Sequence, residues 1–291
     1  MGSEMCIRDS YKWYYGTGNP YQRGSSYSEE NFNWQWQEDL SKDFCFRTYA
    51  YETGEEGDGI VERWAILFDI NPDYPYPKDA SYHGLVGQVK DCLVDHGWEE
   101  NHIKMIFTVS YDELKSAILE LDTKEDGDDI VLLCSNTHGY RGGIALEDRL
   151  LSYEELNSWL DDLGAEAIIY CISACHSGSA IPIIGCKGRV IMTACGAFET
   201  GATAWFLTFL FNEFNVAANW GYYDVPPGPN GAFARNDCDL NGDGWVSAEE
   251  AFPFAREWTE KFHEFWHPEH RPIHPEMYDG YDGELLITKV S

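Results

Sequence analysis

The sequence predicts an α/β fold with a mainly parallel sheet of about six strands and helices on both faces, preceded by a separate β fragment. Beyond residue 61, short apolar runs alternate with helix-like stretches, the order typical of parallel strands joined by crossover helices. Before residue 52, aromatic residues and turn signals gather without helical periodicity. We therefore expect a partial β-sandwich at 1–52, a linker at 53–60 and one larger α/β domain at 61–291.

Two strands and the helix between them can be placed from their residues alone. The strands are the apolar runs Ile130–Cys134 and Ile168–Ile172. Between them, Ser152 and Glu155 have the spacing of a helix capping box, and Gly164 is expected to end the helix. A crossover of this length makes the two strands parallel neighbours, so both should end at the same edge of the sheet.

The charge balance excludes some classes of partner. Lys and Arg number 20 against 50 Asp and Glu, a formal net charge of -30. Such a field repels nucleic acid, whereas cationic substrates, metal ions or a salty medium suit it. No run of 18 apolar residues occurs, so no segment is expected to span a membrane. Residues 1–10 lack the apolar core of a signal peptide and are interpreted as a cloning or assembly scar. The sequence leaves the oligomeric state open.

The nine cysteines form no recognisable disulfide or zinc pattern, because their number is odd and no Cys-x-x-Cys pair occurs. Most lie in expected strands, where buried free thiols behave as small hydrophobic side chains. A disulfide, for example between Cys186 and Cys195, is the alternative. Cys175 is the one cysteine that we interpret differently.

Cys175 and His138 are the candidate nucleophile and base. His138 and Gly139 follow the first of the two strands, and Cys175 follows the second, three residues before Gly178. Open α/β folds carry their sites at the edge where parallel strands end, so the imidazole and the thiol are expected side by side. The thiolate is the reactive form of cysteine and needs such a base. The glycines let the backbone approach a substrate and aim N–H groups at an oxyanion.

Together, these two motifs resemble those of the caspase-like cysteine peptidases, the group of caspases, metacaspases, legumain, clostripain and gingipain. In that group one hydrophobic strand ends in His-Gly, and a later one ends in a small residue and the nucleophilic cysteine. The resemblance covers residues 61–215 in order and spacing. It implies a first strand at Trp64–Ile70 in the centre of the sheet, a first helix at His83–Trp98, a second strand at Asn101–Val109 and a strand at Val190–Ala194 after the nucleophile.

The resemblance also implies roles for individual residues. Cys175 and His138 would form the catalytic dyad of a cysteine endopeptidase with a caspase-like three-layer fold, and the N–H groups of Gly139 and Cys175 would form its oxyanion hole. Three residues are candidates for lining the pocket of the residue before the scissile bond: Ser173, Asp69 and Glu199. The first of these departs from the group, in which that position is often Asp, Glu or Gln. A preference for Arg or Lys therefore cannot be carried over.

A second motif predicts a calcium site. Residues 239–250 fit the twelve-residue EF-hand loop, with oxygen ligands at positions 1, 3, 5, 9 and 12, glycine at 6 and an apolar residue at 8. The expected Ca²⁺ ligands are the side chains of Asp239, Asn241, Asp243, Ser247 and Glu250 and the carbonyl of Trp245. A single loop favours a structural role over a paired sensor. Residues 251–262 are expected to form the helix that follows.

The remaining histidines are interpreted as structural. Those at 263, 267, 270 and 274 lack the spacing of a zinc site, and three prolines interrupt the segment. His176, next to the candidate nucleophile, would point away from it on an extended backbone.

The sequence thus favours a secreted or cell-surface cysteine endopeptidase, stabilised by calcium, that acts on peptides or proteins through an acyl-enzyme. The calcium loop and the acidity favour the extracellular location. Two alternatives stay open: a non-catalytic, calcium-dependent adhesion or scaffold module, and a transpeptidase that uses the same dyad. The aromatic residues of the first 52 positions are interpreted as the core of a truncated sandwich, with a carbohydrate-binding platform as the alternative.

Overall fold

The chain divides into two compact units, Met1–Glu52 and Thr53–Ser291. A computed structural model describes residues 15–17, 26–28, 37–39, 42–44, 57–70, 84–201, 204–212, 230–266, 268–269 and 271–290. In the first unit, β1 (Tyr15–Thr17) pairs antiparallel with β4 (Lys42–Phe44), and β2 (Ser26–Ser28) pairs antiparallel with β3 (Gln37–Asp39). These strands are the β structure expected there; the rest of the predicted sandwich fragment lies outside the described residues.

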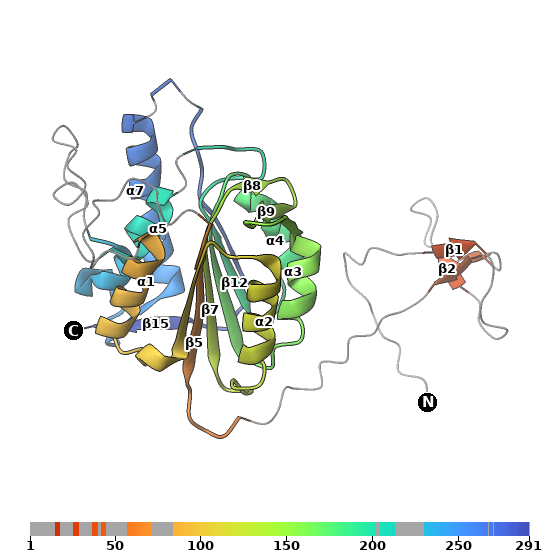
Figure 1. The fold of residues 1–291 in the computed structure, drawn as a ribbon, viewed down its shortest axis with the longest axis horizontal. Coiled ribbons are helices and arrows are strands. Elements are labelled where there is room, and N and C mark those ends of the chain that lie inside the picture. Colours follow the sequence, from red (N-terminus) through yellow and green to blue (C-terminus); the bar gives the residue numbers. More distant parts are fainter. Residues whose placement is uncertain are drawn as a thin grey trace. The chain divides into compact units, whose positions relative to one another are not determined.

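The second unit is built on a six-stranded sheet with the order β14-β12-β11-β7-β5-β6, in which only the β14 edge runs antiparallel (Figure 1). The strands are β5 (Arg63–Asp69), β6 (Ile103–Phe107), β7 (Ile130–Asn136), β11 (Ala167–Ser173), β12 (Arg189–Thr193) and β14 (Glu276–Asp279). Every residue of β11 and β12 is buried, as a parallel sheet covered on both faces requires. The predicted fold class is confirmed.

The placement of the first strand was wrong. We expected Trp64–Ile70 at the centre of the sheet, but β5 is the second strand from one edge, and β7 and β11 are central. The chain first crosses outward from β5 to β6 and then returns to add β7 on the other side of β5. An apolar strand sequence shows that both faces are covered, but not how many strands lie beyond it.

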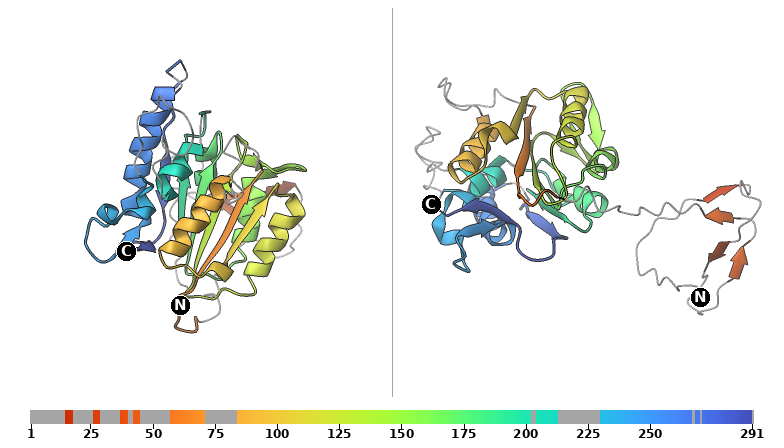
Figure 2. Two further views of the ribbon diagram at one scale, coloured as in Figure 1. Left: turned by 60° about the vertical axis from the view of Figure 1, so that its left-hand side comes forward. Right: turned by 90° about the horizontal axis from the view of Figure 1, so that it is seen from below.

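Helices cover both faces of the sheet and create two separate cores (Figures 1 and 2). One face carries α1 (Gly84–Asp95), α5 (Ala204–Phe211) and α7 (Ala248–Trp266); the other carries α2 (Tyr111–Leu121), α3 (Tyr153–Leu160) and α4 (Ile181–Ile184). Alternate residues of β5 feed the two cores, with Ala65 and Leu67 on the first face and Ile66 and Phe68 on the second.

Shorter elements complete the second unit. A three-stranded antiparallel sheet of β8 (Gly139–Tyr140), β9 (Gly143–Ala145) and β10 (Leu150–Ser152) follows β7, and β13 (Trp245–Ser247) pairs antiparallel with β15 (Leu286–Lys289). The 3₁₀ turns are η1 (Glu100–His102), η2 (Ser177–Ala180), η3 (Ala232–Ala234) and η4 (Asn236–Cys238).

The crossover helix α3 begins where the sequence predicts and ends earlier. Ser152 Oγ accepts the N–H of Glu155 at 3.1 Å, which is half of the predicted capping box. The other half is absent, because the Glu155 carboxylate instead binds the hydroxyl of Tyr111 at 2.6 Å. The helix ends at Leu160 rather than at Gly164, and the next residue, Asp161, pairs with the buried Arg189 of β12 at 2.8 Å. Contacts with residues distant in sequence thus decide both the missing half of the capping box and the point where α3 ends.

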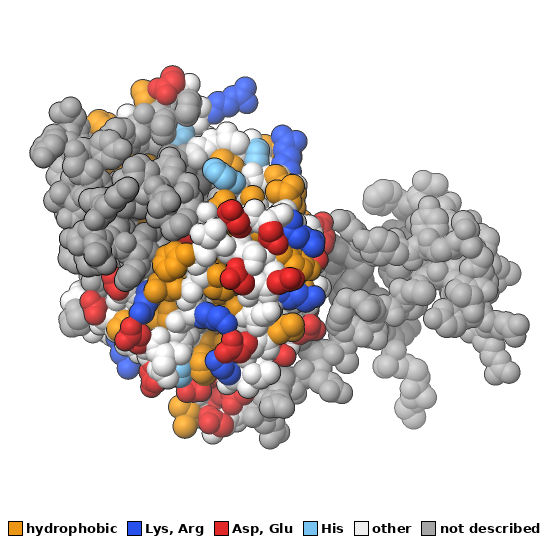
Figure 3. All heavy atoms as spheres, viewed as in Figure 1, with side chains coloured by type: hydrophobic (Ala, Val, Ile, Leu, Met, Phe, Trp, Pro, Cys, Tyr) orange, Lys and Arg blue, Asp and Glu red, His pale blue; other side chains and the backbone are white. Residues whose placement is uncertain are grey.

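The surface of the second unit is charged and mixed. On the face drawn in Figure 3, acidic and basic side chains are interspersed, and apolar side chains form small separate groups. Within the described residues, no helix is long and apolar enough to cross a membrane.

Glu125, in the turn before β7, is a buried acid with incomplete partners. One carboxylate oxygen accepts the N–H of Gly164 at 2.8 Å, and the other is buried without a hydrogen bond. Burial, followed by the nearby charges of Asp122, Asp129 and Asp126, raises the pKa of Glu125 to about 7. Because the pKa of this carboxyl is higher in the folded than in the unfolded protein, the free energy of unfolding falls as the pH rises from about 4.5 to about 7.

We expect Glu125→Gln to stabilise the protein at pH 8, by roughly 1–3 kcal/mol, and to have almost no effect at pH 4.5. Glutamine keeps the acceptor for Gly164 and removes the buried charge. Urea unfolding at both pH values measures the difference, with Glu147→Gln, an exposed acid, as the control. Equal effects of Glu125→Gln at the two pH values would show that this carboxyl does not titrate in that range.

Candidate active site

The ends of β7 and β11 lie side by side at one edge of the sheet. The two strands are parallel and in register, with Asn136 opposite Ser173. The ladder continues one step further, since the N–H of Thr137 donates to the carbonyl of Ser173 at 3.0 Å. His138 and Cys175 follow directly, so the pairing delivers both predicted residues to the same edge.

Gly139 packs directly against the backbone of Cys175. A Cβ atom at position 139 would lie 1.9 Å from the Cys175 carbonyl oxygen and 2.9 Å from the Cβ of Ala174, so no other residue fits there without displacing the backbone. The carbonyl of His138 accepts the N–H of Ala145 at 2.8 Å, which holds the start of the β8–β9 hairpin in place. The two motifs are therefore in contact through their backbones.

Cys175 differs in its surroundings from most of the other cysteines. It is half-buried, its Sγ lies 3.9 Å from the carbonyl oxygen of Gly201, and His138 is exposed. Burial raises the pKa of the thiols of Cys134, Cys171, Cys195 and Cys238, which keeps them protonated and unreactive.

The alternative disulfide between Cys186 and Cys195 is not formed. Both cysteines are free, one before β12 and the other after it, at opposite ends of the strand. Of the described cysteines, only Cys175 and Cys186 are half-buried; the rest are buried.

Two of the three predicted pocket residues, Asp69 and Ser173, lie at the ends of their strands and are joined through Asn136. Asn136 donates from Nδ2 to Oδ2 of Asp69 at 3.0 Å and accepts at Oδ1 from the hydroxyl of Ser173 at 3.3 Å. Asp69 is 1 % exposed and Ser173 is fully buried. This chain of bonds runs across the ends of β5, β7 and β11 and fixes them together. That these residues contact a substrate stays a prediction.

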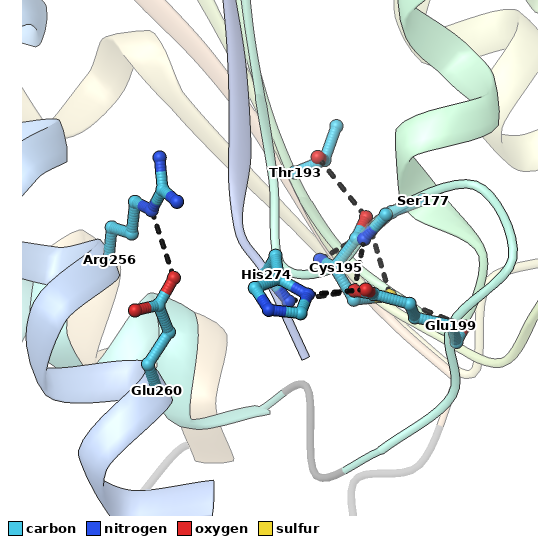
Figure 4. A network of polar contacts seen from close by, with 8 residues as sticks. Ser177, Thr193, Cys195, Glu199, Arg256, Glu260 and His274 are labelled. Carbon is cyan, nitrogen blue, oxygen red and sulfur yellow. Dashed lines mark hydrogen bonds and ion pairs between the residues drawn. The ribbon is translucent and has the colours of Figure 1, made fainter. Parts of the chain in front are cut away.

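Glu199, the third predicted pocket residue, lies in the loop after β12, with its carboxylate against His274 (Figure 4). Its carboxylate accepts the N–H of Gly196 at 2.8 Å and both the N–H and the Nδ1 of His274, at 2.7 and 2.5 Å. Burial acts to raise the pKa of Glu199, but these hydrogen bonds outweigh it and leave the pKa lowered. Its backbone carbonyl accepts the N–H of His176 at 2.8 Å, so Glu199 holds this loop onto the turn after the nucleophile.

Sequence reasoning missed three residues at this edge: Asn136, His274 and Glu276. A Cβ on Gly178 would lie 2.4 Å from Oε2 of Glu276, which places that carboxylate beside the turn that follows Cys175. Burial and the charge of Glu199 raise the pKa of Glu276. Asn136 could have been found, because it continues the strand that leads to His138. The other two lie on a segment about a hundred residues from the nucleophile in sequence, where no local pattern marks them.

His176 and His263 have structural surroundings. His176 has a left-handed backbone, with φ of 60°, and its Nδ1 lies 3.3 Å from the carbonyl oxygen of Ala197. His263, on α7, is 1 % exposed, and its Nε2 would lie 2.5 Å from a Cβ on Gly201. Since the carbonyl of Gly201 contacts Cys175, α7 reaches the back of the candidate nucleophile.

The loop 239–250 folds back on itself around its acidic side chains. The Asp239 carboxylate accepts the N–H groups of Gly242, Asp243 and Gly244 at 2.7–3.2 Å. The Glu250 carboxylate reaches across the loop, accepting the N–H of Leu240 at 2.7 Å and that of Ser247 at 3.0 Å. Two glycines take positive φ, at 77° and 91°, as the tight turn requires: Gly242 and Gly244.

An acid outside the loop also adjoins it, since Asn241 donates to Glu284 at 2.6 Å. Within the described residues, the one group of three or more acids that can bring one oxygen each to within 4.8 Å of the others is a different one, formed by Asp58, Asp126 and Asp128.

The loop 239–250 lies at the opposite end of α7 from the candidate nucleophile. Its residues Trp245–Ser247 form β13, which pairs with β15, and two cations lie over the indole ring of Trp245, Arg63 at 4.5 Å and Lys289 at 5.1 Å from its centre. Arg63 is the first residue of β5, at the edge of the sheet where the parallel strands begin. Helix α7 has 19 residues, and its rise from Ala248 at the loop to His263 is about 22 Å.

Comparison with solved structures finds the caspase fold. The crystal structure of caspase-1 from Spodoptera frugiperda superimposes on this chain with a TM-score of 0.50 over 79% of this chain and 90% of that chain, at 14% sequence identity. No family model matches the sequence. No curated protein matches it either. The chain therefore has a caspase-like α/β fold with a mainly parallel central sheet.

Gly139→Ala should destabilise the second unit more than an ordinary glycine substitution. The new methyl group would meet the Cys175 carbonyl at 1.9 Å, so one of the two motifs must move, at a cost of about 2–4 kcal/mol. Gly59→Ala is the control, because Gly59 has φ of 88° but open space around it, and only the backbone strain of about 1 kcal/mol is expected. Urea unfolding measures both; equal losses would contradict the close packing.

Proposed function

We propose that the protein is a cysteine endopeptidase in which Cys175 is the nucleophile and His138 the general base. The observation that carries this proposal is the contact of Gly139 with Cys175 at the ends of two register-matched parallel strands. The caspase-like fold supports it, because sites of open α/β sheets lie at this edge. A half-buried thiol with an exposed histidine on the neighbouring strand end suits nucleophilic catalysis.

The proposed reaction has two stages. His138 takes the Sγ proton, the thiolate attacks the peptide carbonyl, and the imidazolium returns the proton to the leaving amine as the C–N bond breaks. Water, activated by the same imidazole, then hydrolyses the thioester and releases the acid product. The N–H groups of Gly139 and Cys175 are the proposed donors to the oxyanion formed in each stage.

The loop 239–250 is proposed to hold one Ca²⁺. Its side chains offer three carboxylates, an amide and a hydroxyl, and a turn with two positive-φ glycines brings them into one loop. The ligands would be Asp239, Asn241, Asp243, the carbonyl of Trp245, Ser247 and Glu250. A bound cation would neutralise acids that otherwise repel one another at the start of α7. An extracellular or surface location, where calcium is abundant, is proposed on the same ground.

Cys175→Ala should abolish peptide cleavage, with a fall in kcat/KM of at least about 10⁴-fold, while the melting temperature stays close to that of the wild type. His138→Gln should lose about 10³-fold or more for lack of a base. Cleavage profiling of a peptide library measures both, and Cys186→Ala, at the other half-buried cysteine, is the matched control that should retain full activity. If the wild-type protein reacts with an alkylating probe at Cys175 but cleaves no peptide, the result would favour the non-catalytic module.

Calcium should raise the melting temperature of the wild type, and a chelator should reverse the effect. At a hundredfold excess of Ca²⁺ over the dissociation constant, mass action supplies about 2.7 kcal/mol. Glu250→Gln should abolish this response, whereas Glu264→Gln, exposed on the same helix, should not. We expect chelation to lower the cleavage rate too, because α7 links the loop to Gly201 behind Cys175 through His263. A melting temperature indifferent to calcium removes the site; a shift without a change in rate leaves it purely structural.

A further inference from the structure

Two basic side chains lie over one aromatic ring at the end of the sheet where the parallel strands begin. The ring is that of Trp245; the guanidinium carbon of Arg63 lies 4.5 Å from its centre, and Nζ of Lys289 lies 5.1 Å from it. Arg63 is the first residue of β5, and Asp69, the last, lies at the edge that carries the candidate active site. The length of this strand, about 20 Å, separates the pair of cations from that site.

Arg63 carries a charge that no described acid balances. Its side chain is half-buried, its Nε is shielded from solvent and has no hydrogen-bond partner, and it forms no ion pair with any residue that the structure describes. Burial lowers the pKa of this guanidinium, yet arginine stays charged at neutral pH. A charge removed from water without a counter-ion destabilises the folded state. The chain has 50 acidic residues against 20 basic ones, so a shortage of acids is not the reason.

A second ring with two cations over it shows how the chain balances such a pair elsewhere. Arg149 lies 3.9 Å and Lys115 lies 6.0 Å from the centre of the Tyr111 ring. There the carboxylate of Glu155 accepts the hydroxyl of Tyr111 at 2.6 Å and pairs with Arg149 at 3.2 Å. No acid in the described part of the chain takes this role at the ring of Trp245, so the anion that complements the pair comes from outside the described chain.

Both cations are held in place before a ligand arrives. Lys289 lies opposite Trp245 in the β13–β15 pair, and its backbone N–H donates to the carbonyl of His96 at 3.1 Å. The stem of the Lys289 side chain passes 3.4 Å from the position of a Cβ on Gly97, so it lies along that backbone. Arg63 is fixed by the pairing of β5 with β7. Groups fixed in advance lose little entropy when they bind a ligand.

We propose that Arg63 and Lys289 form a binding site for a small divalent oxyanion, namely a phosphate group, either free or as an ester, beside the ring of Trp245. Two fixed positive charges match phosphate, which carries nearly two negative charges at neutral pH, whereas a carboxylate balances only one of them. The guanidinium supplies a planar fork of donors, and the ammonium supplies a point charge. The net charge of -30 repels polyanions, which favours a compact anion. The site is independent of the proposed peptidase chemistry.

Isothermal titration of the full chain with inorganic phosphate, at constant ionic strength and with a calcium chelator, measures the site. We expect one phosphate per chain, with the affinity reduced at least about tenfold in Arg63→Met and about 3–10-fold in Lys289→Met. The matched controls are Arg149→Met and Lys115→Met, at the other ring with two cations, and both should bind phosphate as the wild type does. A wild type without saturable binding, or an affinity unchanged in both site variants, overturns the proposal.

Two further ligands define what the site recognises. Methyl phosphate presents the same group as an ester: an affinity equal to that of inorganic phosphate indicates a site that accepts phosphate esters, and a weaker one indicates a site for the free anion. Either result supports the phosphate site. Acetate carries a single charge and should bind at least about tenfold more weakly than phosphate. Acetate that binds as tightly as phosphate overturns the assignment to a divalent anion.

Thermal melting separates a ligand site from a cation that only supports the fold. Without phosphate, Arg63→Met should melt at or above the wild-type temperature, because methionine keeps an apolar stem over Trp245 and removes an unbalanced charge. A hundredfold excess of phosphate over its dissociation constant should raise the wild-type melting temperature by about 5 °C or more, and that of Arg63→Met hardly at all. An equal loss of stability in Arg63→Met with and without phosphate overturns the proposal. Because Lys289 is exposed, Lys289→Met keeps the titration decisive if Arg63→Met does not fold.

Discussion

The parallel, in-register pairing of β7 with β11 is the constraint on which the candidate site depends. It delivers the segments that contain His138 and Cys175 to the same edge, and a glycine at 139 lets their backbones meet. Strand pairing in a sheet buried on both faces is strongly specified, because a shift of one residue would turn every apolar side chain to the wrong core. The stability of the two cores therefore also fixes the relative positions of the thiol and the imidazole segments.

Around this pairing, polar contacts divide the edge into two flanks of different character. Asn136 joins buried groups of β5 and β11 on one flank, so its bonds tie strands together. On the other flank, the loop after β12 is bonded to the turn that follows Cys175 and leaves Phe198 exposed. The first flank joins the strand ends, and the second carries an exposed aromatic ring.

The C-terminal third of the chain connects the end of the sheet where the parallel strands begin with the end where they finish. Helix α7 begins beside the loop 239–250 and places His263 against Gly201, whose carbonyl contacts Cys175. The same third adds β14 as the antiparallel edge strand and brings His274 to Glu199. One packed helix therefore reaches from the loop 239–250 to the backbone that contacts Cys175.

The sequence by itself determined the fold class, the crossover between β7 and β11, and the two residues at their ends, because hydrophobic period and strand-end glycines are local properties. It also identified the oxygen-bearing side chains of the loop 239–250 and their spacing. The tertiary structure decided the position of β5 in the sheet, the early end of α3 at Leu160 and the contact of Glu199 with His274. Each of these depends on a partner distant in sequence, and a local pattern carries no information about which distant residue will arrive.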